Sequence, residues 1–170
     1  MKRTVKLIII LCLFVQIGNA QTVKTDEEYK VVFDSLVSRF KVMEKDTCGI
    51  AGKSFSEFVK FMERHDLKII RVEMYHYDKY APPQHLYGVK LWFTTNEFTG
   101  YSMNNALVEP TMSLIFTESK SYEKALNLLR KYQGYFTEEV VAFYADAVIE
   151  EITEIYIPDE MYSKRHIRYQ

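Results

Sequence analysis

The sequence predicts an α+β fold with two layers, in which an antiparallel sheet of three to five strands carries helices packed on one face. Two observations predict it: stretches with helical spacing of apolar residues that begin at capping residues, and stretches in which apolar and polar residues alternate. The chain has 170 residues, of which 48% are hydrophobic and 26% charged, so we expect one globular domain over residues 21–170.

Residues 1–20 have the three parts of a secretory signal peptide. Lys2, Arg3 and Lys6 form a positive start, residues 7–15 are an uninterrupted apolar run, and small residues precede a cut after Ala20. The run is about half of the ~20 residues that a membrane span needs, although an uncleaved anchor is the alternative. We therefore expect a protein exported to the periplasm or the medium, without a stable membrane span after cleavage.

Two helices are expected near the start of the domain. Thr25 and Glu28 match a capping box, and apolar residues at helical spacing follow, which predicts a helix over 26–44. Ser54 and Glu57 form a second capping box, and the helix after it is predicted to end near residues 65–66.

A change to alternating residues predicts a hairpin. Residues 68–77 and 87–95 each place apolar side chains on one face, and the connection over 78–86 contains Pro82 and Pro83. Because that connection is too short for a parallel crossover, the two strands are expected to be antiparallel.

The second half of the chain adds elements of both kinds. Turn residues predict a surface loop or a short ragged strand over 96–110, and residues 112–117 predict a strand. A helix is expected to start after Ser121 and stop at Gly134, and another to begin at Thr137. Residues 145–157 fit a helix or a strand, and their β-branched residues favour a strand for 153–157.

Aromatic residues on the hairpin are the main candidates for a binding surface. Exposed Tyr and Trp offer rigid contact area with a polar tip, so they suit a protein, peptide or glycan partner. Cross-strand packing of the same rings is the alternative. The five residues are Tyr75, Tyr77, Tyr80, Tyr87 and Trp92. We therefore expect a non-catalytic binding protein that needs no cofactor, and a net charge of −1 gives no reason to expect nucleic acid as its partner.

A small secreted hydrolase is the alternative function. His76, Asp78 and His85 flank the hairpin loop, and two imidazoles with a carboxylate can hold a zinc ion. Cys48 is the other candidate, since a thiol activated by a histidine is a nucleophile. It is the one cysteine left after cleavage, so the mature chain cannot form an intrachain disulfide. The sequence does not indicate an oligomeric state.

Overall fold

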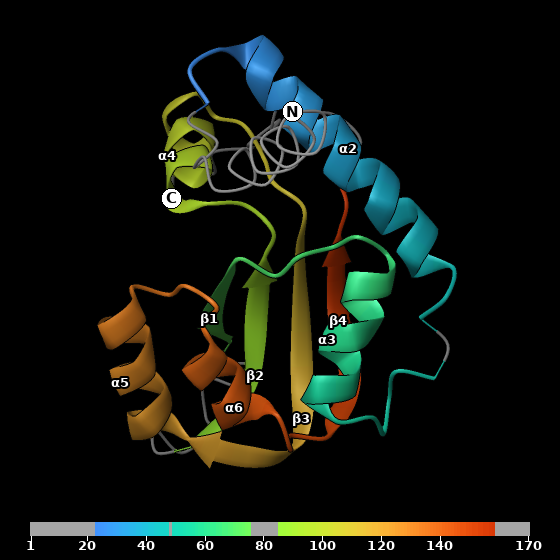
Figure 1. Ribbon diagram of the computed structural model, residues 1–170, viewed down its shortest axis with the longest axis vertical. Coiled ribbons are helices and arrows are strands. Elements are labelled where there is room, and N and C mark those ends of the chain that lie inside the picture. The colour runs from blue at the N-terminus through green and yellow to red at the C-terminus, as the bar shows by residue number, and fades with distance from the viewer. Residues whose placement is uncertain (1–22, 48, 76–84, 159–170) are drawn as a thin grey trace, which may run out of the picture.

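A computed structural model describes residues 23–47, 49–75 and 85–158. The predicted α+β fold is confirmed: four antiparallel strands form one sheet in the order β1-β2-β3-β4, and helices pack on it (Figure 1). Within these ranges the elements are α2 (Asp26–Glu44), α3 (Phe55–Arg64), β1 (Arg71–Tyr75), β2 (His85–Trp92), α4 (Asn96–Asn104), β3 (Thr111–Ser121), α5 (Tyr122–Tyr132), α6 (Glu138–Tyr144) and β4 (Ile149–Tyr156).

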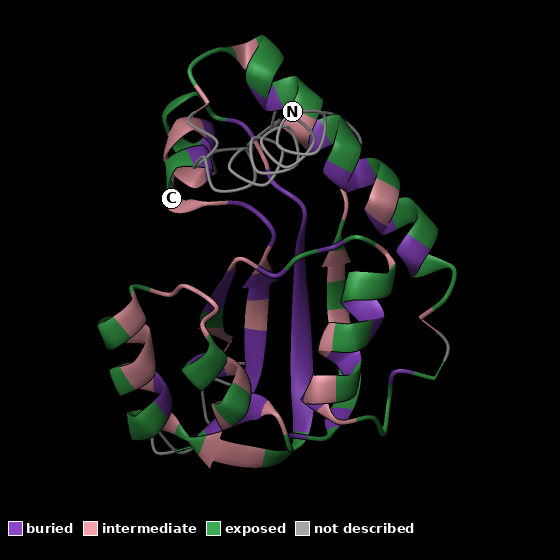
Figure 2. Ribbon diagram, viewed as in Figure 1, coloured by how far each residue is buried: buried purple, intermediate pink, exposed green. Residues whose placement is uncertain are grey.

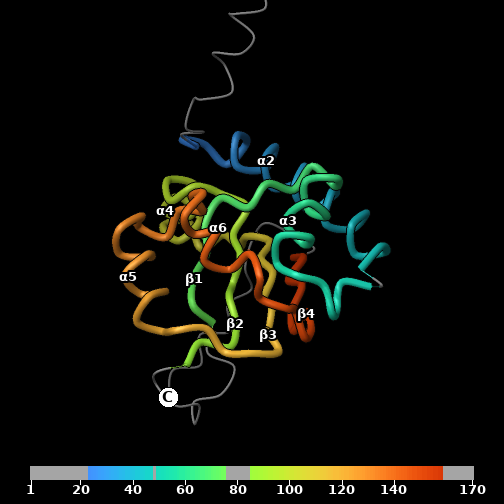
Figure 3. The backbone as a smooth tube through the Cα atoms, turned by 60° about the horizontal axis from the view of Figure 1, so that its bottom comes forward, coloured from blue at the N-terminus to red at the C-terminus, as the bar shows by residue number. Residues whose placement is uncertain are grey.

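The two layers meet in one large hydrophobic core. Helices α3, α5 and α6 lie over one face of the sheet, with α5 beside β1 and α3 beside β4 (Figures 1 and 3). Alternate residues of the strands point into this core, among them Val72, Val89, Leu91, Leu114 and Phe116. Figure 2 shows that β3 is buried along most of its length, while the outer sides of the helices are exposed. Burial of this apolar surface is the main stabilisation of the fold.

Helix α2 spans two hydrophobic clusters. Its first half packs against α4, where the rings of Tyr29 and Phe98 are stacked with their centroids 4.3 Å apart. Its second half belongs to the main core, where Phe40 meets Phe93 edge to face at 4.7 Å. None of the helices in the described ranges is both long and apolar enough to cross a bilayer.

The expectation of a loop over residues 96–110 is wrong, because residues 96–104 form α4. Thr95 caps this helix by accepting a hydrogen bond from the backbone N–H of Phe98 at 3.3 Å. Gly100 suggested a turn but lies inside the helix, and burial of Phe98 and Ser102 offsets the weak helix propensity of glycine.

The undecided segment after Ala145 closes the sheet as β4. Its register against β3 shifts twice, between Ser113 and Leu114 and between Ile115 and Phe116. These irregularities bring Ile149, Ile152 and Ile155 to the core although they are three residues apart. A spacing of three resembles a helix, which explains why the pattern was ambiguous.

Gly88 allows β2 and β3 to approach closely at the centre of the sheet. A Cβ added to it would lie 2.4 Å from the carbonyl oxygen of Leu114 and 3.4 Å from the ring of Tyr75. The first distance is too short for any side chain, so the pairing of Gly88 with Ile115 and Tyr75 requires glycine at this position.

We expect Gly88→Ala to destabilise the protein by about 1–3 kcal/mol, the usual cost of forcing extra atoms into a packed site. Gly100→Ala is the matched control, because an added Cβ there meets nothing within 4 Å. It should raise the free energy of unfolding by about 0.5–1 kcal/mol, since alanine favours the helix. Urea unfolding of both variants checks the opposite signs; two changes of the same sign would contradict this account of Gly88.

The capping box of α3 should make stability depend on pH. The Ser54 backbone N–H and hydroxyl donate to the carboxylate of Glu57 at 3.0 and 2.9 Å, and these bonds lower the pKa of Glu57. A carboxylate whose pKa is lower in the folded protein stabilises the fold. This stabilisation is fully present above the pKa of the unfolded chain and is lost as the pH falls through the pKa of the folded protein. Ser54→Ala removes the N-cap hydroxyl and one of the two bonds to Glu57, so it should lower the free energy of unfolding at pH 7 and lower it less in acid.

Urea unfolding between pH 2 and pH 7 measures this difference. Ser121→Ala is the control: Ser121 caps α5 by accepting the N–H of Lys124 at 3.4 Å, and a lysine stands where α3 has Glu57. The cost of Ser121→Ala should vary little over the same range. An equal pH dependence of the two costs would contradict the role given to Glu57.

Candidate functional site

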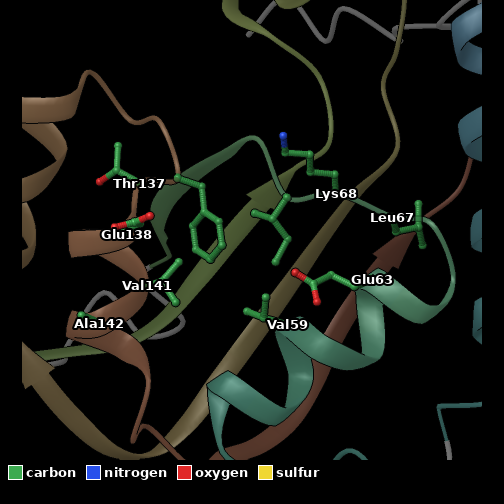
Figure 4. A pocket seen from close by; sticks show the side chains of 10 residues that line it. Val59, Glu63, Leu67, Lys68, Thr137, Glu138, Val141 and Ala142 are labelled. Carbon is green, nitrogen blue, oxygen red and sulfur yellow. The ribbon is translucent and has the colours of Figure 1, made fainter. Parts of the chain in front are cut away.

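A hollow lined by described residues lies between α3 and α6. It has a volume of about 400 Å³, within the range of pockets that hold small molecules. Its walls are mainly apolar: Val141 of α6 extends into it (Figure 4), and Phe136, just before α6, also lines it. The apolar side chains around it are Val59, Leu67, Ile69, Phe136, Val141 and Ala142. We call this hollow the α3–α6 pocket.

Helices α3 and α6 meet where Phe55 packs on Tyr144, with ring centroids 5.7 Å apart, and the α3–α6 pocket lies beyond that contact. Phe136 is fixed beside β1, since its N–H donates to the carbonyl oxygen of Ile70 at 2.9 Å. The backbone of Tyr135 likewise bridges to Arg71. The segment before α6 is therefore held at the edge of the first strand, while α3 lies over the last one (Figure 1).

Two carboxylates stand on opposite sides of the pocket opening. Glu63 comes from the last turn of α3 and Glu138 from the first turn of α6, and both are exposed (Figure 4). Lys68 extends along the upper rim and is also exposed. The opening thus carries two negative charges and one positive charge, around an apolar interior.

A buried polar network lies at the end of the sheet next to α4, where β1 begins and β2 ends. The Arg71 guanidinium donates through Nε to the Thr94 carbonyl oxygen at 3.0 Å and through Nη2 to the Thr99 hydroxyl. The hydroxyls of Thr94 and Thr99 both donate to Oε2 of Glu109, the second at 3.1 Å. Ser102 donates to Oε1 of Glu109 at 2.6 Å. Hydroxyl groups therefore link a buried cation to a buried anion.

The network is shielded from water. Arg71 is 6% exposed and Glu109 is 5% exposed. Burial lowers the pKa of Arg71, and the negative charge of Glu109 partly offsets that effect. Burial also raises the pKa of nearby Tyr29, with a further contribution from Glu109. Tyr29 is therefore protonated and donates to the carbonyl oxygen of Val108 at 2.6 Å.

The predicted aromatic residues are divided between two places. Register pairs Arg71 with Trp92 and Tyr75 with Gly88, so Tyr75 and Trp92 share the face of the sheet that points away from α3, α5 and α6. We call it the rear face. Tyr75 lies over Gly88, which is cross-strand packing, and Tyr87 is 36% exposed at the irregularity between Leu86 and Gly88. Tyr77 and Tyr80 lie outside the described residues.

The predicted catalytic residues are mostly outside the described ranges. His76, Asp78 and Cys48 lie outside the described residues, so the zinc and thiol hypotheses remain predictions. His85 is described, and its Nδ1 is 2.8 Å from the hydroxyl of Ser119. Within the described part of the chain, no three His, Cys, Asp or Glu residues are grouped to hold a metal ion.

Sequence reasoning missed Arg71 and Glu109. Arg71 stands in an alternating strand, where a charged residue on the polar side is expected to face water. Glu109 precedes Pro110 in the segment that was expected to be a loop. The available signal was the series Thr94, Thr99 and Ser102, whose hydroxyl groups are donors that a buried carboxylate needs.

Removing either end of the network should be costly. We expect Arg71→Met and Glu109→Gln each to lower the free energy of unfolding by about 3 kcal/mol, because each leaves a buried charge without its partner. The double variant should cost at least ~1 kcal/mol less than the sum. Thermal and urea unfolding of the four proteins measures this coupling.

The exposed pair Lys30–Asp34 is the control for this cycle. Nζ of Lys30 and Oδ2 of Asp34 are 2.6 Å apart, but both side chains are more than half exposed. Its coupling should stay below about 0.5 kcal/mol. Additive costs for Arg71 and Glu109 would show that the hydroxyls do not transmit an interaction between the two charges.

Comparison with known proteins found no matching family model, no matching curated protein and no matching solved structure. The function is therefore inferred from the geometry of the pocket and the rear face.

Proposed function

We propose that the protein is a non-catalytic binding protein that acts after export and holds the apolar part of a small ligand in the α3–α6 pocket. The single observation that carries the proposal is the pocket of about 400 Å³ with apolar walls. An open apolar pocket with a few polar groups at its rim is the usual form of a small-molecule site.

The charges at the opening favour a ligand with a positive end. Glu63 and Glu138 stand on either side of an opening that Lys68 only partly balances. A cation on the ligand would be attracted to the two carboxylates while its apolar body enters the pocket. We therefore assign the ligand to the class of small amphiphiles with an apolar chain or ring and a cationic group.

Export rests on the leader alone. The charged start, the apolar run and the small residues before the cut support removal of residues 1–20. The aromatic residues of the hairpin stay a predicted contact surface for a protein, peptide or glycan.

Three probes with the same eight-carbon tail test the pocket: octylamine, octanol and octanoate. We expect octylamine to shift the backbone amide resonances of Ile69, Val141 and Ala142, and to bind about fivefold more tightly than octanoate. A fivefold ratio of dissociation constants corresponds to about 1 kcal/mol of binding free energy, which is the size expected for a unit charge near an exposed carboxylate. Nitrogen-15 NMR titration measures the shifts and the dissociation constants.

Two variants separate the pocket from nonspecific binding. Glu63→Gln combined with Glu138→Gln should remove the preference for octylamine over octanol, while Glu150→Gln, an exposed change on β4, should leave it unchanged. Ala142→Phe should weaken all three probes by filling the pocket. The proposal fails if no probe shifts the three amides, or if octanoate binds most tightly.

A further inference from the structure

A second hollow lies on the rear face, on the other side of the sheet from the α3–α6 pocket. It has a volume of about 260 Å³, which is roughly the space of eight or nine water molecules at ~30 Å³ each. Lys90 and Trp92 of β2, Thr111 of β3 and Tyr156 of β4 form one side of it, and α4 forms the other. We call it the Trp92 cleft.

The side of the cleft next to α4 has its hydrogen bonds satisfied. Thr99, Ser102 and Glu109 line the cleft and belong to the buried network, in which the Glu109 carboxylate accepts three hydroxyl bonds. This wall is held rigidly by its own contacts. The capacity for new hydrogen bonds therefore lies on the strand side.

Two polar atoms on the strand side have no hydrogen-bond partner in the described structure. They are Nε1 of Trp92 and Oγ1 of Thr111, and both are buried. Thr111 is only 2% exposed, so solvent does not satisfy its hydroxyl. An unpaired buried donor costs free energy that an acceptor in the adjoining cleft would recover.

Two cationic side chains lie beside the Trp92 ring. The Arg71 guanidinium lies 4.8 Å from the ring centroid of Trp92, and the Lys90 amino group lies 5.4 Å from it. Glu109, Glu73 and Glu97 all act on Arg71, and Lys90 is the cation among the described residues that line the cleft itself. The Trp92 cleft therefore combines an N–H donor, a hydroxyl and a cation, all of which suit an anionic oxygen acceptor.

We propose that the Trp92 cleft is a binding site for the carboxylate of a small organic acid of about the size of a sugar acid. One carboxylate oxygen accepts the indole N–H of Trp92, the other accepts the hydroxyl of Thr111 after rotation of that side chain, and Lys90 neutralises the charge. The site is separate from the α3–α6 pocket and takes a ligand of the opposite charge.

The protein itself supplies the reporter for this site. Trp92 is the single tryptophan of the chain, so the indole N–H gives one NMR resonance and the tryptophan fluorescence comes from the cleft alone. Glucuronate, glucose and acetate are suitable probes. Glucose has the same ring as glucuronate without the carboxylate, and acetate has the carboxylate without the ring.

We expect glucuronate to shift the indole resonance and change the fluorescence at concentrations where glucose has no effect, with acetate weaker than glucuronate. Added salt should weaken glucuronate binding, because a charge pair near the surface is screened. Equal responses to glucose and glucuronate would overturn the assignment to a carboxylate. Absence of any indole response to the three probes would overturn the site.

Variants assign the contacts. Thr111→Val keeps the shape of the side chain and removes the hydroxyl, so glucuronate should bind at least about fivefold more weakly. Thr117→Val is the same change on β3 outside the cleft, and this variant should bind glucuronate as tightly as the unaltered protein does. Lys90→Gln should also weaken binding at least about fivefold and reduce its salt dependence. Unchanged binding in Lys90→Gln would overturn the proposal even if Thr111→Val failed to fold.

The result is independent of the α3–α6 pocket. The octylamine titration is followed at Ile69, Val141 and Ala142, and the glucuronate titration at the Trp92 indole, so failure of one proposal leaves the other measurable.

Discussion

The hydroxyl-mediated link between Arg71 and Glu109 determines how the end of the sheet is built. A buried guanidinium and a buried carboxylate are both expensive to remove from water, and neither would persist here without its partner. The hydroxyls of Thr94 and Thr99 connect them, and this arrangement requires α4 to lie against the end of β1 and β2. The position of α4 in turn creates one wall of the Trp92 cleft.

The two sides of the sheet consequently have different chemistry. The side under α3, α5 and α6 is apolar, and where α3 and α6 do not meet it leaves a pocket with apolar walls and carboxylates at its opening. The rear face carries polar and aromatic residues, and near α4 it forms a cleft with unpaired donors and neighbouring cations. The two proposed sites therefore lie on opposite faces of one sheet.

Much of the fold was predictable from local patterns. The caps at Thr25 and Ser54, the alternation in β1 and β2, and the stop at Gly134 each act within a few residues, and each is confirmed. Helix α4 was not predictable in this way. Its glycine and asparagines favour a turn, and burial of Phe98 and Ser102 against distant parts of the chain reversed that preference.

The candidate sites, like the fold, depend partly on local sequence patterns and partly on contacts between distant segments. By itself, the sequence determined the α+β class, most of the helix and strand types, and the concentration of aromatic residues on the hairpin, because these depend on spacing and on nearest neighbours. Only the tertiary structure decided that Trp92 stands beside Thr111 and Tyr156, and that Phe136 faces α3 across a pocket. Those neighbours come from segments far apart in the chain, and their meeting depends on strand register, bulges and buried charge rather than on any local pattern.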